Sequence, residues 1–99
     1  MNKRIRDKKR GFSNEDLWNL DRTVLEFLLP RLKEFRKRTF GYPPQFTYED
    51  WVQLLDDACS AIESYLKDDY LLTDDGAARY DKDIKTIHRL FDNFFYLWY

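Results

Sequence analysis

The chain contains one histidine and one cysteine, and these two side chains are the first candidates for chemistry. His88 could serve as a general base, with Asp92 one helical turn away to orient its ring. The simpler interpretation, which we favour, is a pairing of His88 with Asp92 along a helix surface. Cys59 falls on an apolar stripe, which favours a small core residue over a reactive thiol.

Carboxylates occur in consecutive pairs that could suggest a site for a hard cation: Asp56–Asp57, Asp68–Asp69 and Asp74–Asp75. Adjacent side chains on a helix point about 100° apart, so a consecutive pair does not converge on one ion. The three glycines are too scattered for a phosphate-binding loop, and no nucleophile elbow is present. We therefore expect no metal, no cofactor and no enzymatic activity.

Basic side chains that follow Pro30 are better candidates for a binding site, because they cluster and a tyrosine follows them. Cations beside aromatic rings suit phosphates and stacked bases, so the pattern predicts a site for an anionic ligand. The alternative is a solvated helix end, where cations complement the helix dipole. The predicted ligand-binding residues are Arg31, Lys33, Arg36, Lys37, Arg38 and Tyr42.

Asp21 lies close to an apolar face, between Leu17 and Val24 in the helical spacing. A buried carboxylate without a partner is costly, so we predict a structural polar role for Asp21 with an arginine as its partner. The alternative places Asp21 at the edge of the stripe, where it meets Arg22 or water.

The first helix that positions these residues is expected over residues 13–39. Ser13 with Asp16 three residues later forms a capping-box pattern. Pro30 lies inside the helix and predicts a kink near residues 26–30. Its apolar residues recur at helical spacing: Leu17, Trp18, Leu20, Val24, Leu25, Leu28, Leu29, Leu32 and Phe35.

A second helix is expected over residues 47–67, with Thr47 and Asp50 as its capping pair, and a third begins within residues 75–80. Their expected apolar faces are Trp51, Leu54, Leu55, Ala58, Cys59, Ile62, Tyr65 and Leu66, and then Tyr80, Ile84, Ile87, Phe91, Phe94 and Trp98. No strand-like alternation appears. The sequence predicts an all-α fold, a small three-helix bundle with long first and third helices over residues 13–99, after a flexible basic arm at residues 1–12.

The last six residues, FFYLWY, carry no charge and are aromatic on every face. An exposed tail of this kind is an aggregation hazard, so it should pack on the first two helices or lie in an oligomer interface. We predict that Tyr96, Trp98 and Tyr99 belong to a protein interface. Aromatic residues make up 18% of the chain, a surplus for one small core, which favours a homo-oligomer.

The net charge of −1 conceals an uneven distribution. Residues 22–40 hold six basic and two acidic side chains, whereas residues 48–83 hold eleven acidic and three basic ones. Such blocks attract each other within one chain or between copies, or recruit a partner of opposite charge. For a basic protein partner, the predicted interface residues are Asp56, Asp57 and Asp68.

A single cysteine fits a reducing setting, and no apolar run of 18 residues is long enough for a membrane span. A cytoplasmic protein without a membrane partner is therefore expected. Nucleic acid is a less favoured partner, because a dedicated DNA-binding domain is usually basic throughout.

Two segments resemble a family of small, largely uncharacterised proteins of tailed bacteriophages and prophages. They are WNLDRTVLEFLLPRLKEF, residues 18–35, and GYPPQFTYEDWVQLLDDACSAIESY, residues 41–65. The shared features are a Trp-x-Leu-Asp segment, a Leu-Pro-Arg-Leu-Lys segment, a Gly-Tyr-Pro turn and a tryptophan in the second helix. The matching positions are Trp18, Leu20, Asp21, Leu29 to Lys33, Gly41 to Pro43 and Trp51.

The resemblance implies a viral accessory protein that counters host defence by binding, in the cytoplasm of an infected bacterium. Our first hypothesis is an oligomer that sequesters a nucleotide immune signal at the basic and aromatic residues. The second is an inhibitor that binds a host defence or nucleic-acid-processing protein through its acidic face. The third is a structural or assembly component of the phage.

Overall fold

The computed structural model describes residues 11–98 of the chain. The predicted basic arm, as far as residue 10, and Tyr99 of the predicted interface lie outside this part. Within residues 11–98 the regular structure is entirely helical, which confirms the predicted all-α fold. In chain order the elements are α1 (Glu15–Trp18), α2 (Leu20–Arg38), α3 (Tyr48–Lys67), η1 (Tyr70–Leu72), α4 (Gly76–Asp92) and η2 (Phe94–Tyr96).

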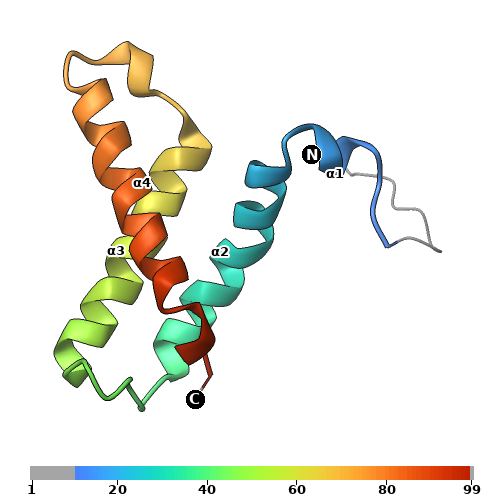
Figure 1. Cartoon of the computed structure of the whole chain (residues 1–99). Helices are drawn as coiled ribbons and strands as arrows, with labels where there is room; N and C mark the ends of the chain where they lie inside the picture. The colour runs from blue at the N-terminus through green and yellow to red at the C-terminus, as the bar shows by residue number, and fades with distance from the viewer. Residues whose placement is uncertain (1–10, 99) are drawn as a thin grey trace.

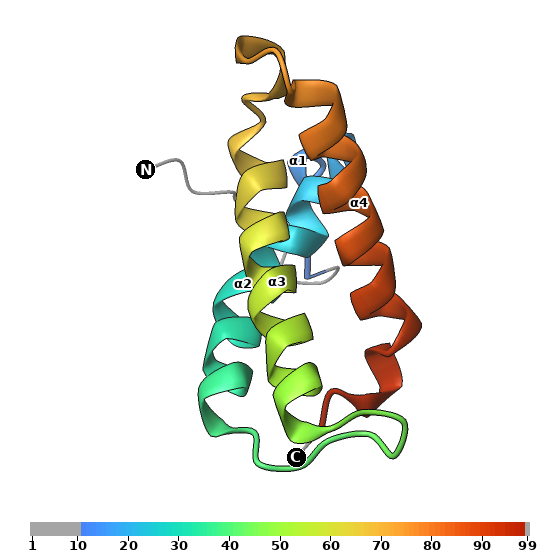
Figure 2. The same ribbon diagram turned by 90° about the vertical axis from the view of Figure 1, so that its left-hand side faces the viewer.

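The central helix is α3, which packs against α2 on one side and α4 on the other (Figure 1). A view turned by 90° shows the three helices running along one common direction (Figure 2). Most of the core comes from α3, and α2 and α4 each add two fully buried residues. The buried core residues are Leu25, Leu32, Trp51, Leu54, Leu55, Ala58, Cys59, Ala61, Ile62, Ile87 and Leu90.

Helix α3 begins and ends as its sequence predicts. The Thr47 hydroxyl accepts a hydrogen bond from the backbone N–H of Asp50 at 3.1 Å, which satisfies one of the free amides of the first turn. The helix ends at Lys67, because Asp68 adopts the left-handed conformation, with a φ of 54°. Asp tolerates the left-handed conformation better than most residues, so ending the helix at this position costs little free energy.

The predicted first helix is wrong in one respect, because it is interrupted near its start. Asn19 leaves the helical conformation, with φ −129° and ψ 64°, and separates α1 from α2. The Thr23 hydroxyl donates to the Asp16 carbonyl at 3.0 Å across this elbow, and the Ser13 N–H donates to the Asp16 carboxylate at 3.0 Å just before α1. Asn favours such breaks because its side chain competes with helical hydrogen bonds. Helix α2 is continuous across Pro30.

The exposure of the first apolar stripe also differs from the prediction. Leu25 and Leu32 are buried, but the side chains that precede Leu25 on this face are exposed. The reason is visible in Figure 1, where the N-terminal half of α2 diverges from the α3–α4 pair. The exposed members are Leu17, Trp18, Leu20 and Val24.

Two further corrections concern α4 and the C-terminus. The third helix ends at Asp92, and residues 94–96 form the separate turn η2. Leu90, which the sequence pattern left out of the core, is fully buried, whereas Phe91 and Phe94 remain substantially exposed. The C-terminal segment does not pack as a whole on α2 and α3, because only Leu97 joins the edge of the core.

The connection between α3 and α4 is braced by side chains. The buried Tyr70 donates a hydrogen bond from its hydroxyl to Asp83 at 2.6 Å. Arg79 bonds Asp69 at 3.4 Å and the Thr73 hydroxyl at 3.0 Å. Gly76 starts α4 directly against the Tyr70 carbonyl, where a Cβ atom would lie 1.5 Å from the oxygen.

Candidate functional site

Most of the predicted anion-binding cations on α2 are engaged by side chains of the same protein. The Lys33 ammonium contacts Glu63 at 2.7 Å, and the Arg36 guanidinium contacts Asp56 at 2.9 and 3.3 Å. Arg38 pairs with Glu34 on its own helix at 2.8 Å. The structure thus brings the basic block of α2 against the acidic block of α3, and the two blocks neutralise each other within one chain.

The other three members of this set lie apart. Arg31 stacks over the Phe27 ring at 3.7 Å and donates to the Phe27 carbonyl at 2.8 Å, one turn before the proline. Lys37 is exposed, without an ion pair to the residues described here. Tyr42 is exposed in the following loop, where its ring meets the edge of Tyr48 at 6.4 Å. These groups do not converge on one pocket.

The predicted acidic interface residues are all exposed. Asp56 is held by Arg36, and Asp57 accepts a hydrogen bond from Gln53 at 2.8 Å. Asp68 follows the last residue of α3. With a rise of about 1.5 Å per residue, Asp68 lies roughly 16 Å along the helix from Asp57, a separation that one protein partner can span.

Asp21 has a partner, but the predicted arginine is wrong. Its carboxylate accepts a hydrogen bond from the Tyr65 hydroxyl of α3, and the side chain is exposed at the edge of the stripe. This hydrogen bond lowers the pKa of Asp21. The same bond, together with burial, raises the pKa of Tyr65 to about 12. Arg22 instead donates to the Leu66 carbonyl, so both side chains tie the start of α2 to the end of α3.

His88 and Cys59, the candidate general base and the candidate reactive thiol, are not arranged for catalysis. His88 is exposed on α4, and no hydrogen bond joins it to Asp92 within the described part of the chain. The Cys59 thiol is buried in the core, as predicted, and burial raises its pKa. Residues 11–98 contain no cluster of metal-ligating side chains, and none of the helices there is both long and apolar enough to cross a membrane.

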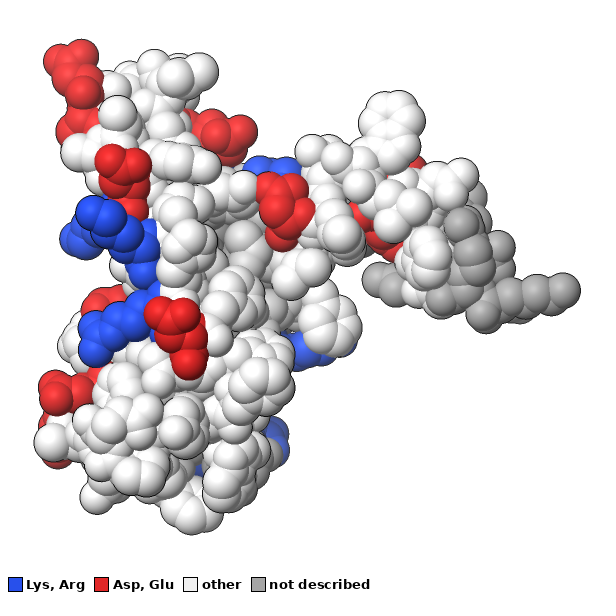
Figure 3. All heavy atoms as spheres, in the orientation of Figure 1, with Lys and Arg blue, Asp and Glu red and all other residues white. Residues whose placement is uncertain are grey.

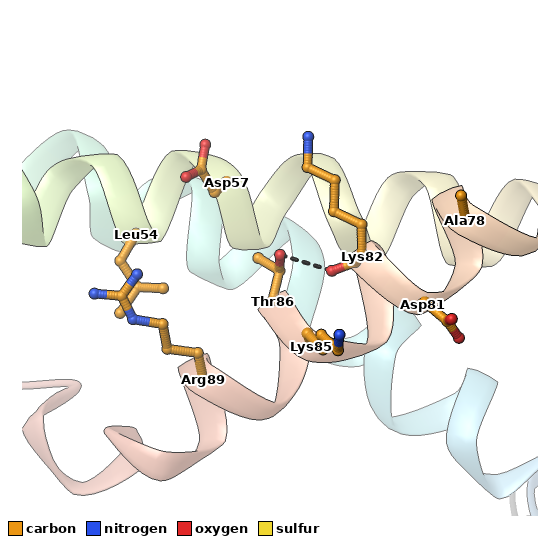
Figure 4. Close-up of a pocket in the computed structure, with 8 residues that line it drawn as sticks. All are labelled: Leu54, Asp57, Ala78, Asp81, Lys82, Lys85, Thr86 and Arg89. Carbon is orange, nitrogen blue, oxygen red and sulfur yellow. Dashed lines mark hydrogen bonds between the residues drawn. The ribbon is translucent and has the colours of Figure 1, made fainter. Parts of the chain in front are cut away.

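A row of cations that the sequence analysis missed lies on α4, beside a surface pocket of about 490 Å³ between α3 and α4. Lys82, Lys85 and Arg89 line this pocket together with Thr86 (Figure 4). Their spacing of three and four residues places them on one helix face, and this spacing is the signal that could have revealed them.

Unlike Lys33, Arg36 and Arg38 of α2, these α4 cations form no ion pair with the described residues. Arg89 makes only a distant cation–π contact, 5.8 Å from the Phe46 ring centroid. Leu54 and Ala78 are the apolar residues of its lining and lie at opposite ends of it (Figure 4). Two carboxylates, Asp57 and Asp81, also line it and reduce its positive charge without removing it.

An apolar hollow of about 470 Å³ lies on a different face of α4, in the wedge between α2 and α4. Tyr65 of α3 forms its base, and its only ionisable neighbours besides Tyr65 are Asp21 and His88. The wedge opens on the side of the molecule drawn in Figure 3, where charged side chains are sparse between α4 and α2. Its apolar lining residues are Leu20, Val24, Leu25, Ile84, Ile87 and Phe91.

The predicted aromatic interface residues that the structure describes are accessible. Trp98 is 72% exposed and Tyr96 is 38% exposed, beside Phe95 at 89%. The alternative of a tail packed on its own chain is therefore not what the structure has. No family model, curated protein sequence or solved structure matches this chain.

Proposed function

We propose that this protein is a non-enzymatic binding protein that sequesters an anionic ligand of the nucleotide class. Its setting, as an accessory protein with which a tailed phage or prophage counters host defence, follows from the resemblance of residues 18–65. The proposal locates the ligand on α4 rather than on the predicted basic residues of α2.

The observation that carries this proposal is the unpaired cationic row Lys82, Lys85 and Arg89. A cation already bonded to a carboxylate must give up that bond before it binds phosphate, whereas an unpaired cation loses only water. Lysine and arginine at this spacing can contact several phosphate oxygens at once.

Native mass spectrometry of the protein purified from bacterial cells, with small molecules retained, tests the ligand class. A bound mass in the nucleotide range is the expected result. Binding of a fluorescent nucleoside diphosphate, titrated by anisotropy at several salt concentrations, then locates the site. The affinity should fall steeply with salt, because cation–phosphate contacts dominate it.

Two triple variants that remove the same charge discriminate between the sites. Replacement of Lys82, Lys85 and Arg89 by alanine should weaken nucleotide binding at least tenfold, whereas replacement of Arg31, Lys33 and Arg36 should leave it within twofold. The reverse pattern would return the site to α2. Absence of both a nucleotide-sized adduct and nucleotide binding by the wild-type protein would overturn the function itself.

A second candidate, an inhibitor that binds a host protein, is favoured by the tip between α3 and α4. Leu71 is 99% exposed and Leu72 82% exposed, on a turn that Tyr70 and Arg79 hold in place. Apolar side chains presented on a braced, acidic turn suit a basic partner surface with an apolar pocket. Loss of capture of a defined host partner by Leu71→Ser, with nucleotide binding unchanged, would support this function.

A further inference from the structure

The wedge between α2 and α4 is lined by side chains that a folded chain ordinarily buries. Val24 and Leu25 form one wall, and Ile84 and Ile87 form the other. At this level α2 is tied to α3 and not to α4: Tyr65 of α3 donates to Asp21, and Arg22 donates to the Leu66 carbonyl at the end of α3. Of the wedge lining, Leu25 and Ile87 are buried in the core, whereas Leu20, Val24 and Phe91 remain 53%, 45% and 38% exposed within residues 11–98.

The exposed apolar surface continues from the wedge onto α1 and the outer face of α2. Trp18 is 85% exposed, Phe27 is 56% exposed, and Leu17, Leu20 and Val24 lie between them. At about 150–250 Å² per aromatic side chain, the two rings alone leave roughly 300 Å² uncovered. The three aliphatic side chains add to this, which brings the patch to the size of the largest apolar patches on monomers, about 300–600 Å² and often functional, and toward the ~800 Å² that each partner of a stable dimer contributes.

Charge argues against an ionic occupant of the wedge. Apart from Tyr65, Asp21 and His88 are its only ionisable lining residues, and Asp21 already accepts the Tyr65 hydroxyl. Residues 1–10 offer poor cover by composition, because they contain six lysine or arginine residues and only Met1 and Ile5 as apolar side chains. A suitable occupant is apolar and close to neutral.

The chain itself presents such an occupant. Leu17 and Trp18, 53% and 85% exposed, belong to α1, which among the described elements packs chiefly against α2 and stands clear of the α3–α4 pair (Figure 1). The same continuous surface thus carries a projecting apolar knob and an apolar hollow. A two-fold contact places each knob against the hollow of the other copy, and this self-complementarity is what a symmetric dimer requires.

We infer that a second copy of this chain docks in the α2–α4 wedge, with the Leu17–Trp18 knob of each copy against the hollow of the other. The contact does not involve the cationic row, which lies on a different face of α4. The dimer therefore leaves both anion sites accessible, and the inference does not depend on the proposed ligand.

Sedimentation equilibrium of the full chain over a dilution series measures this association. The wild-type protein should be a dimer, and Trp18→Ser or Val24→Asp should raise its dissociation constant at least about 30-fold, the effect of losing one hot-spot residue. Both side chains are exposed within one chain, so circular dichroism should show unchanged helix content. Leu71→Ser, at a side chain that is 99% exposed but distant from the wedge, is the matched control and should remain dimeric.

Two results would overturn the inference. One is a wild-type protein that stays monomeric throughout the dilution series, which would leave the wedge to a different occupant. The other is an oligomer that persists in both wedge variants, which would place self-association elsewhere, for example at Trp98. Neither result bears on nucleotide binding by the α4 cations, so this inference and the proposed function fail separately.

Discussion

The guanidinium of Arg36 on α2 holds the carboxylate of Asp56 on α3 through two contacts, Nε to Oδ1 at 2.9 Å and Nη2 to Oδ2 at 3.3 Å. The bridge joins α2 and α3, which bury Leu32 and Leu55 in the shared core. The two side chains are 33% and 51% exposed, so water and salt screen the attraction between them. Its contribution to stability should be small, about 0.2–1 kcal/mol, despite the good geometry.

Arg36→Ala should therefore lower the free energy of unfolding by no more than about 1 kcal/mol, and by less at high salt. Urea denaturation at low and high ionic strength measures this. The exchanged pair, Arg36→Asp with Asp56→Arg, serves as the control and should recover most of the loss. A loss well above 2 kcal/mol that does not depend on salt would show that Arg36 acts through packing rather than through its charge.

The helices themselves could be predicted because their signals are local. Thr47 and Asp50 lie three residues apart, so one short segment is enough to predict the start of α3. The helical spacing of the apolar residues from Trp51 to Ile62 identifies the face that is buried. The break at Asn19 was missed because the hydrogen bonds that hold it join Asp16 to Thr23 across the break. No capping motif in the sequence predicts a break of this kind.

The candidate site could not be predicted as well, because it depends on how helices pair. Whether Arg36 is available to a ligand is decided by Asp56, twenty residues later, and the register between α2 and α3 brings them together. Asp21 and Tyr65 meet for the same reason, 44 residues apart. Sequence clustering favoured the α2 cations, but unlike blocks of one chain can neutralise each other as soon as they pack.

The hydrogen bond between Tyr65 and Asp21 predicts a defined pH dependence of stability. Because the pKa of Asp21 is lowered, the ionised carboxylate contributes stability at pH values above its ordinary pKa of 3.8. This contribution is lost as the pH falls through the lowered pKa. Because the pKa of Tyr65 is raised, the protonated hydroxyl contributes stability at pH values below its ordinary pKa of 10.0. This contribution is lost as the pH rises toward the raised pKa of about 12. Tyr65→Phe should lower the free energy of unfolding by about 1 kcal/mol between these limits.

Urea denaturation of the wild-type protein and of Tyr65→Phe across this pH range checks the prediction, since the difference between them should shrink at both ends. Tyr42→Phe is the control, because the Tyr42 ring is exposed and makes a ring contact only with Tyr48. A constant difference from acid to alkaline pH would mean that the Tyr65 hydroxyl contributes to stability independently of the charge on Asp21.

Gly76 lies where α4 begins against the turn η1, and its lack of a side chain is required there. A Cβ atom would lie 1.5 Å from the Tyr70 carbonyl oxygen and 2.6 Å from its carbonyl carbon, and backbone atoms cannot rotate away as a side chain does. Gly76→Ala should cost about 1–3 kcal/mol or more, as an overpacked position does. Gly41→Ala, where a Cβ meets nothing within 4 Å, should change stability by about 0.5 kcal/mol or less.

Thermal denaturation of the two glycine variants, followed by circular dichroism, separates these expectations. The braced turn also holds Leu71 and Leu72 outward, so Gly76→Ala should make this turn more sensitive to limited proteolysis. Equal melting temperatures for the two variants would show that the α3–α4 connection accommodates a side chain by moving, and that its bracing is weaker than the contacts of Tyr70 suggest.

Leu90 and Phe95 present opposite expectations for two apolar residues at the same end of the molecule. Leu90 is fully buried against the α3 face, so Leu90→Ala removes packed methyl groups and leaves a cavity, at a cost of about 2–5 kcal/mol. Phe95 is 89% exposed, so Phe95→Ala should cost a single chain less than about 0.5 kcal/mol. Chemical denaturation at low protein concentration, where self-association is minimal, measures both. A large loss from Phe95→Ala under these conditions would mean that the C-terminal aromatic segment packs on its own chain, as one of the two sequence-based alternatives holds.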